Sequence, residues 1–138
     1  IVYSSLAFHY VPDFQKLAND IYNLLNTGGY LLFSQEHPIV TATFDGKQHY
    51  NKDENDNYTS FTFSNYNQPG ERDTFWYVDG VKKYHRTFSN IISALCRVGF
   101  VIDTVCEPLP IENATDFIPN ILEKELIKPT FLIVKASK

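Results

Sequence analysis

A glutamate and a histidine stand side by side after the second apolar segment of the chain, in the order Glu36-His37-Pro38. In open sheets of parallel strands, ligands bind beyond the carboxyl ends of the strands, where this tripeptide is expected to lie. An imidazole with the ordinary pKa of about 6.5 accepts a proton near neutrality, so His37 could serve as a general base. Glu36 could orient that histidine or bind a substrate amine. The alternative is a loop whose polar groups bond only to the neighbouring backbone.

A second group of polar residues, Tyr84-His85-Arg86-Thr87, precedes a helical pattern. Arg86 or His85 could bind an anionic or hydroxylated substrate. The alternative is a helix N-terminus that Thr87 caps, with the charges in solvent. That alternative suits Arg86 less well, because a cation gains nothing at the positive end of a helix dipole.

Aromatic side chains and one arginine are concentrated between the two polar groups, among them Tyr66, Arg72 and Trp76. A lid of aromatic rings would exclude water and shape a pocket. It is at least as reasonable that these rings only pack the segment onto a sheet. The two cysteines, Cys96 and Cys106, have no second ligand at metal-binding spacing, so we expect buried, reduced thiols and no metal site.

The elements that must hold these residues begin with a strand-helix-strand unit. Residues 1–8 are apolar without alternation, which is typical of a strand covered on both faces. Pro12 and Asp13 open a helix, and Gly28-Gly29 closes it. Residues 30–34 form a second buried strand, so parallel pairing with a right-handed crossover is predicted.

Residues 38–83 are polar and carry two partly alternating stretches, 58–66 and 74–84, on either side of the turn signal Asn67-Gln68-Pro69-Gly70. They predict one inserted antiparallel hairpin that covers something. A helix from 88 to 98, a strand from 100 to 107, a weaker helix over 114–127 and a last strand from 130 to 135 follow. The last strand could return antiparallel. We expect one α/β domain over residues 1–138, in which 38–83 form the insertion.

Composition excludes several classes of protein. The chain has 138 residues, a net charge of -4 and 43% hydrophobic residues, which suits one globular domain. Because the chain has no basic stripe, nucleic acid is not expected as a partner. No apolar run is long enough to cross a membrane and no signal peptide is visible, so a cytoplasmic protein is predicted.

The ordered set of segments resembles the C-terminal half of a class I S-adenosylmethionine-dependent methyltransferase, of the small-molecule, ubiquinone/menaquinone-biosynthesis-like type. "IVYSSLAFHYVPDFQKLANDIYNLLNTGGYLLFSQEHP" is similar to that family's fourth strand, fourth helix and fifth strand. "KYHRTFSNIISALCRVGF" is similar to the helix before its sixth strand, and "KPTFLIVKA" to its seventh, antiparallel strand. The resemblance implies a partial Rossmann-like sheet in the order 4-5-7-6, within a complete order of 3-2-1-4-5-7-6.

The resemblance also implies roles for residues. The stretch from Ser5 through Leu6 and Ala7 to His9 would approach the methionine end of S-adenosyl-L-methionine. Glu36 and His37 would face the substrate, and so would Trp76, Tyr84, His85 and Arg86. No Gly-rich turn opens a helix in this chain, so most of the cofactor would be bound by an N-terminal half, and activity of the chain alone is not expected.

Two functions follow as expectations. The first is methyl transfer to a small molecule by the complete protein. The second is a non-enzymatic binding or dimerising module with half of a methyltransferase fold. In either case the edge of the strand at residues 1–8 is expected to pair with the missing half or with a second copy.

Overall fold

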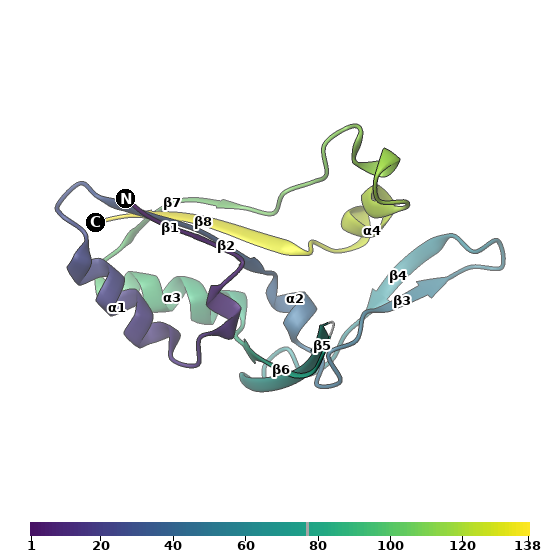
Figure 1. The fold of residues 1–138 in the computed structure, drawn as a ribbon, viewed down its shortest axis with the longest axis horizontal. Coiled ribbons are helices and arrows are strands. Elements are labelled where there is room, and N and C mark those ends of the chain that lie inside the picture. The colour runs from purple at the N-terminus through teal and green to yellow at the C-terminus, as the bar shows by residue number, and fades with distance from the viewer. Residues whose placement is uncertain (77) are drawn as a thin grey trace.

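The computed structural model describes residues 1–76 and 78–138, without the side chains of 75 to 79. Four strands form the main sheet, in the spatial order β1-β2-β8-β7 (Figure 1). They are β1 (Val2–Ser5), β2 (Tyr30–Glu36), β7 (Val101–Cys106) and β8 (Phe131–Ser137). β1 and β2 are parallel, and β8 runs antiparallel to both of its neighbours. This confirms the α/β class and the predicted order, with an antiparallel last strand between its neighbours.

Two helices lie on one face of the sheet, α1 (Phe14–Leu24) and α3 (Phe88–Val98) (Figure 1). Asp13 caps α1 by accepting a hydrogen bond from the Lys16 amide at 2.8 Å. Thr87 and Asn90 form a reciprocal capping box on α3, as the sequence predicted for Thr87. Caps of this kind are worth about 1 kcal/mol each, so both helix starts are fixed by local chemistry.

The hydrophobic core fills the space between these helices and the sheet. Its fully buried sheet residues are Leu31, Phe33, Leu132, Val134 and Ala136, which alternate along β2 and β8. The other face of the sheet bears no helix in the described part of the chain (Figure 1). β1 therefore alternates between half-buried and exposed residues, and Tyr3 is 68% exposed.

The segment between β2 and α3 differs from its prediction. It contains α2 (Pro38–Thr41) and two hairpins, of β3 (His49–Lys52) with β4 (Tyr58–Thr62) and of β5 (Gly70–Trp76) with β6 (Val78–His85). The predicted pairing of 58–66 with 74–84 was wrong. A turn lies two positions before the predicted one, at 65–68, where the Gln68 amide donates to the Asn65 carbonyl at 2.9 Å, and it separates the two hairpins.

The connection from β7 to β8 holds a short 3-10 turn, η2 (Ala114–Asp116), and the helix α4 (Ile121–Ile127). This confirms a weak helix interrupted near Pro119. Another 3-10 turn, η1 (Phe8–Tyr10), ends the first strand earlier than predicted. The prediction of buried thiols was wrong, because Cys96 lies on the outer side of α3 and Cys106 on the edge strand β7, and both are exposed.

None of the described helices has the length and apolar character that crossing a bilayer requires. Within residues 1–76 and 78–138, no group of three His, Cys, Asp or Glu side chains is arranged to hold a metal ion.

Candidate active site at the carboxyl ends of β1 and β2

The parallel pairing of β1 with β2 brings the residues that follow both strands to one edge of the sheet. Beyond β1 the chain turns sharply at Leu6, whose φ is 51°, while its amide donates to the Ser34 carbonyl at 2.9 Å. A leucine in the left-handed region is uncommon, and such backbone strain is concentrated at functional sites. Ser5, Leu6 and Ala7 are exposed at this turn, where a cofactor could reach them.

His9 joins the two strand ends. Its side chain is buried, and its Nδ1 accepts a hydrogen bond from the Glu36 amide at 3.3 Å. Burial lowers the pKa of His9, and although Glu36 acts in the opposite direction, Lys83 and Arg86 reinforce the lowering. The imidazole therefore stays neutral near pH 7, and its ring lies 4.2 Å from that of Tyr10.

Glu36 ends β2 with a half-satisfied carboxylate. One oxygen, Oε1, accepts from the Lys83 ammonium at 2.6 Å, and the Glu36 side chain is 19% exposed. The other oxygen, Oε2, is buried and has no hydrogen-bond partner among the described residues. An unpartnered buried oxygen is costly, so Oε2 is a natural acceptor for a bound N–H or O–H group.

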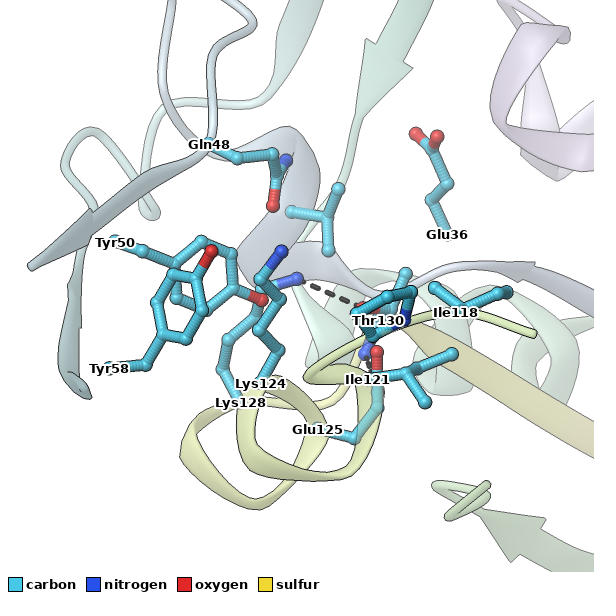
Figure 2. A pocket seen from close by; sticks show the side chains of 12 residues that line it. Glu36, Gln48, Tyr50, Tyr58, Ile118, Ile121, Lys124, Glu125, Lys128 and Thr130 are labelled. Carbon is cyan, nitrogen blue, oxygen red and sulfur yellow. Dashed lines mark hydrogen bonds between the residues drawn. The ribbon is translucent and has the colours of Figure 1, made fainter. Parts of the chain in front are cut away.

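Glu36 lines three pockets; the smallest, of about 150 Å³, lies toward Lys83, and the other two meet at Glu36. The smaller of these two has a volume of about 210 Å³ and is lined by Leu6, His9, Tyr10, Glu36 and Phe131. The larger, of about 640 Å³, extends from Glu36 toward the β3–β4 hairpin and α4 (Figure 2). Glu36 thus separates a pocket beside the end of β1 from a larger pocket beside the β3–β4 hairpin.

The larger pocket has aromatic and cationic walls. Tyr50 and Tyr58 come from the β3–β4 hairpin, and Lys124 and Lys128 come from α4 and its C-terminal end (Figure 2). Burial, with a smaller effect from Glu125, raises the pKa of Tyr50 to about 12, so its hydroxyl remains protonated. The pocket therefore offers N–H and O–H donors opposite the acidic Glu36.

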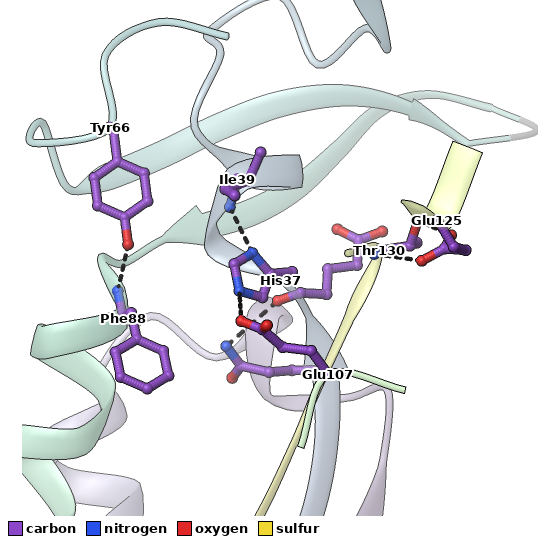
Figure 3. A network of polar contacts seen from close by, with 9 residues as sticks. His37, Ile39, Tyr66, Phe88, Glu107, Glu125 and Thr130 are labelled. Carbon is purple, nitrogen blue, oxygen red and sulfur yellow. Dashed lines mark hydrogen bonds and ion pairs between the residues drawn. The ribbon is translucent and has the colours of Figure 1, made fainter. Parts of the chain in front are cut away.

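Both ring nitrogens of His37 have partners within the protein, whereas a general base needs a free nitrogen that faces the substrate. Its Nδ1 accepts from the Ile39 amide at 3.2 Å as the N-cap of α2, and its Nε2 lies 3.0 Å from Glu107 Oε1 (Figure 3). Burial lowers its pKa in spite of Glu107. Both ring nitrogens are thus engaged in holding α2 to the end of β7, and the role of His37 as a general base stays a prediction.

The other predicted substrate residues hold the framework together. His85 is buried between Thr41 Oγ1 and the Tyr66 carbonyl, each 2.8 Å from one ring nitrogen. The guanidinium of Arg86 donates to the carbonyls of Val11, Pro12 and Tyr84, and the Tyr84 hydroxyl lies 3.4 Å from Glu71.

The predicted lid aromatics are placed only in part. The Tyr66 hydroxyl accepts from the Phe88 amide at 3.0 Å and so fixes the start of α3 (Figure 3). The side chain of Trp76 lies outside the described residues, so its predicted place in the pocket is untested. Lys83, adjacent to the predicted group, is the residue that reaches the site, and alternation along β6 is the signal that could have revealed it, since Lys83 and His85 point to the same side.

The sequence and the fold of the chain are both similar to those of known proteins. No protein-family model matches the chain. It is 31% identical over all 138 residues to an uncharacterized protein of Haemophilus influenzae, of which it spans 53%. It superposes with a TM-score of 0.85 on the crystal structure of an S-adenosylmethionine-dependent methyltransferase from Mesorhizobium loti, at 37% identity.

A putative S-adenosylmethionine-dependent methyltransferase from Listeria monocytogenes gives a TM-score of 0.82 at 31% identity. In both cases 99% of this chain is covered, and it covers 60% of the solved protein. The chain therefore spans a little more than half the length of the proteins that it matches. Over that length, its fold is the fold of S-adenosylmethionine-dependent methyltransferases.

Proposed function

We propose that the complete protein transfers a methyl group from S-adenosyl-L-methionine to a small molecule, with Glu36 at the reacting atoms. The observation that carries the proposal is the unpartnered Glu36 Oε2 at the junction of two pockets. It lies at the edge of a sheet that superposes on solved methyltransferases. We expect residues 1–138 alone to be inactive, because they cover only 60% of the methyltransferases that they match and contain no Gly-rich turn that opens a helix.

The residues around the smaller pocket suit the cofactor's positive charge. The Glu36 carboxylate attracts a sulfonium, the lowered pKa of His9 keeps that imidazole uncharged, and the Tyr10 ring offers an aromatic face. Ser5, Leu6 and Ala7 are exposed beside this pocket and would contact the methionine end. The bound cofactor would supply an electrophilic methyl group on sulfur.

Glu36 would act on the acceptor from the other side. The lone pair of the accepting atom forms the new bond to the methyl carbon, and the electron pair of the broken carbon–sulfur bond stays on sulfur. Glu36 Oε2 takes the proton that an O–H or N–H acceptor loses, and Lys83 holds the carboxylate in place through Oε1. Lys83 is thus a positioning residue, and Glu36 is the proposed catalytic residue.

The test follows a labelled methyl group from the cofactor into a small-molecule cell extract, using the full-length protein. We expect Glu36→Gln to lose at least about a hundredfold in rate, as removal of a general base usually does. The matched control is Glu112→Gln, an exposed glutamate of the β7–β8 connection. A Glu36→Gln, Lys83→Met double variant repeats the test without an unpaired buried ammonium. Full rate in both Glu36 variants would contradict the role of Glu36.

A second proposal concerns the edge of the sheet. β1 has one partner strand in the described chain, and Ile1 and Tyr3 are 77% and 68% exposed. Unpaired apolar strand edges invite association, so we propose that β1 pairs with another strand, from a second copy or from further chain of the same protein. Light scattering by the isolated 138-residue chain tests this, and a monomer would contradict it.

A further inference from the structure

Lysine side chains are gathered on aromatic rings in the wall of the larger pocket. Lys124 Nζ lies 4.7 Å from the centroid of the Tyr58 ring and 5.6 Å from that of Tyr50. Lys128 Nζ lies 5.4 Å from the Tyr50 centroid and 5.2 Å from that of Phe61. We call these five residues the lysine–aromatic cluster. Cation–π contacts fix the two ammonium groups in place, four positions apart at the C-terminal end of α4.

Lys128 is an incompletely satisfied buried cation. The residue is 5% exposed, and its ammonium donates to Thr130 Oγ1 at 3.0 Å. An ammonium has three N–H donors, so one acceptor leaves two donors without a strong partner. Burial lowers its pKa, Lys124 reinforces this, and Glu125 and Glu36 oppose it.

Glu125, the carboxylate that most opposes the lowering of the Lys128 pKa, is already engaged. Both carboxylate oxygens of Glu125 bind Thr130, one through the amide at 2.8 Å and the other through the hydroxyl. Glu125 therefore orients Thr130 toward Lys128, and among the ion pairs of the described residues it has none with either lysine of the cluster. Its charge lowers the cost of burying Lys128 without supplying the missing acceptors.

Five of the other lysines have carboxylate partners, and Lys138 donates instead to the main-chain carbonyls of Tyr22 and Leu25. Ion pairs of 2.5 to 2.7 Å hold Lys16, Lys52, Lys82 and Lys83. In the part of the chain that the structure describes, neither Lys124 nor Lys128 has a carboxylate oxygen within ion-pair distance. Because buried charges are ordinarily paired, two adjacent ammonium groups in a pocket wall indicate a counter-charge supplied by a ligand.

We propose that the larger pocket binds the anionic group of the methyl acceptor, a carboxylate or a phosphate, between Lys124 and Lys128. This rests on the proposed function and adds the substrate class: a small molecule with an anion at one end and the accepting atom at the other. Glu36 lines the same pocket away from the two lysines (Figure 2), so the anion is held apart from the carboxylate that takes the proton. Apolar walls from Ile118 and Ile121 leave room for a hydrocarbon or ring between these ends.

The experiment measures binding of three probes to the full-length protein by calorimetry, without cofactor. The probes are benzoate, phenyl phosphate and the uncharged benzyl alcohol. We expect benzoate or phenyl phosphate to bind at least tenfold more tightly than benzyl alcohol. The anion that binds more tightly shows whether the pocket prefers a carboxylate or a phosphate. Lys128→Gln and Lys124→Gln should each weaken the binding of that anion about tenfold or more, since each removes a charged hydrogen-bond donor.

Lys16→Gln is the matched control, because it makes the same charge change on the remote helix α1 and should leave binding unchanged. Lys124 lies at the rim, so its variant tests the inference even where the buried Lys128→Gln fails to fold. Equal binding of all three probes, or anion binding that survives both cluster variants, would overturn the inference. A protein that binds the anion but not S-adenosylmethionine would refute the proposed function and leave the anion site intact.

Discussion

Arg72 is a buried guanidinium whose hydrogen bonds all go to main-chain carbonyls. The residue is 2% exposed, and its nitrogens donate to Ala42 at 3.0 Å, to Gln68 at 2.7 Å, and to Gly70 and Glu71. It lies 4.0 Å from the centroid of the Phe44 ring. The Arg72 side chain thus joins the end of α2 to the turn before β5 and to β5 itself, and so fixes how these elements pack.

Replacement of Arg72 tests whether its hydrogen bonds to main-chain carbonyls stabilise the fold. Arg72→Met keeps an apolar stem but leaves several buried carbonyls without donors, so we expect the free energy of unfolding to fall by about 2–4 kcal/mol. Urea unfolding followed by circular dichroism measures it. Arg97→Met, at an exposed position of α3, should change the same quantity by less than about 1 kcal/mol. An equal decrease in the free energy of unfolding in the two variants would contradict this role of Arg72.

The sequence placed Glu36 and His37 at the correct edge of the sheet but did not separate their environments. Their difference depends on long-range partners: Lys83 reaches Glu36 from 47 positions away, and Glu107 reaches His37 from 70 positions away. Local pattern cannot supply such partners, since they depend on how β6 and β7 are packed. For the same reason, Tyr50, Tyr58 and Lys128 could not be predicted as neighbours.

At the scale of elements, caps and turns were predictable and strand partners were not. Thr87 and Asp13 act through bonds to residues three positions away, which the sequence contains directly. The two polar stretches of the insertion were predicted as strands from their alternation, but alternation carries no information about which strand pairs with which. Each found its partner across its own local turn, giving two hairpins instead of one.

Two glycines that follow helices differ in what surrounds them. Gly99 ends α3 at a φ of 112°, and a Cβ there would lie 3.0 Å from the Tyr22 hydroxyl. Gly28 follows α1 at a φ of 79° with nothing within 4 Å of the added carbon. We expect Gly28→Ala to cost about 1 kcal/mol for backbone strain alone. Gly99→Ala should cost at least about 1 kcal/mol more, because the methyl group presses on the Tyr22 ring.

Thermal and urea unfolding of the two alanine variants compare them directly. A Gly99→Ala, Tyr22→Leu double variant should recover part of the difference, since it removes the crowded ring atoms. If Gly28→Ala were the more damaging change, the packing of Tyr22 against the end of α3 would not be as described.

At the scale of the whole molecule, three buried histidines make stability depend on pH. Burial lowers the pKa of His9, His37 and His85 below the ordinary 6.5. The unfolded chain therefore binds more protons than the folded chain as the pH falls through 6.5. Their contribution is fully present above that pH and is lost as the pH falls toward the lowered values.

We expect the free energy of unfolding to decrease between pH 7 and pH 5, by up to about 1.4 kcal/mol per pH unit for each histidine. Urea unfolding at several pH values measures the slope. The pKa values of Asp45 and Asp53 are also lowered from their ordinary 3.8. Their effect on the free energy of unfolding is therefore expected at pH values below this window. A stability that rises as the pH falls from 7 to 5 would contradict the burial of these imidazoles.

The parallel pairing of β1 with β2 was predictable from the order of the segments and the Gly turn between them, whereas the strand order of the whole sheet was predicted from the resemblance to a family. The site is more dispersed: it draws on β1, β2, β6, the β3–β4 hairpin and α4. The proposed function requires that this edge of the sheet binds a methyl donor.

Titration of S-adenosyl-L-methionine into the full-length protein, followed by calorimetry, tests that claim most directly. We predict saturable binding to one site, weakened in Glu36→Gln and unchanged in Glu112→Gln. A full-length protein that is folded and gives no binding heat at any temperature tried, and no protection from thermal unfolding by the cofactor, would contradict it.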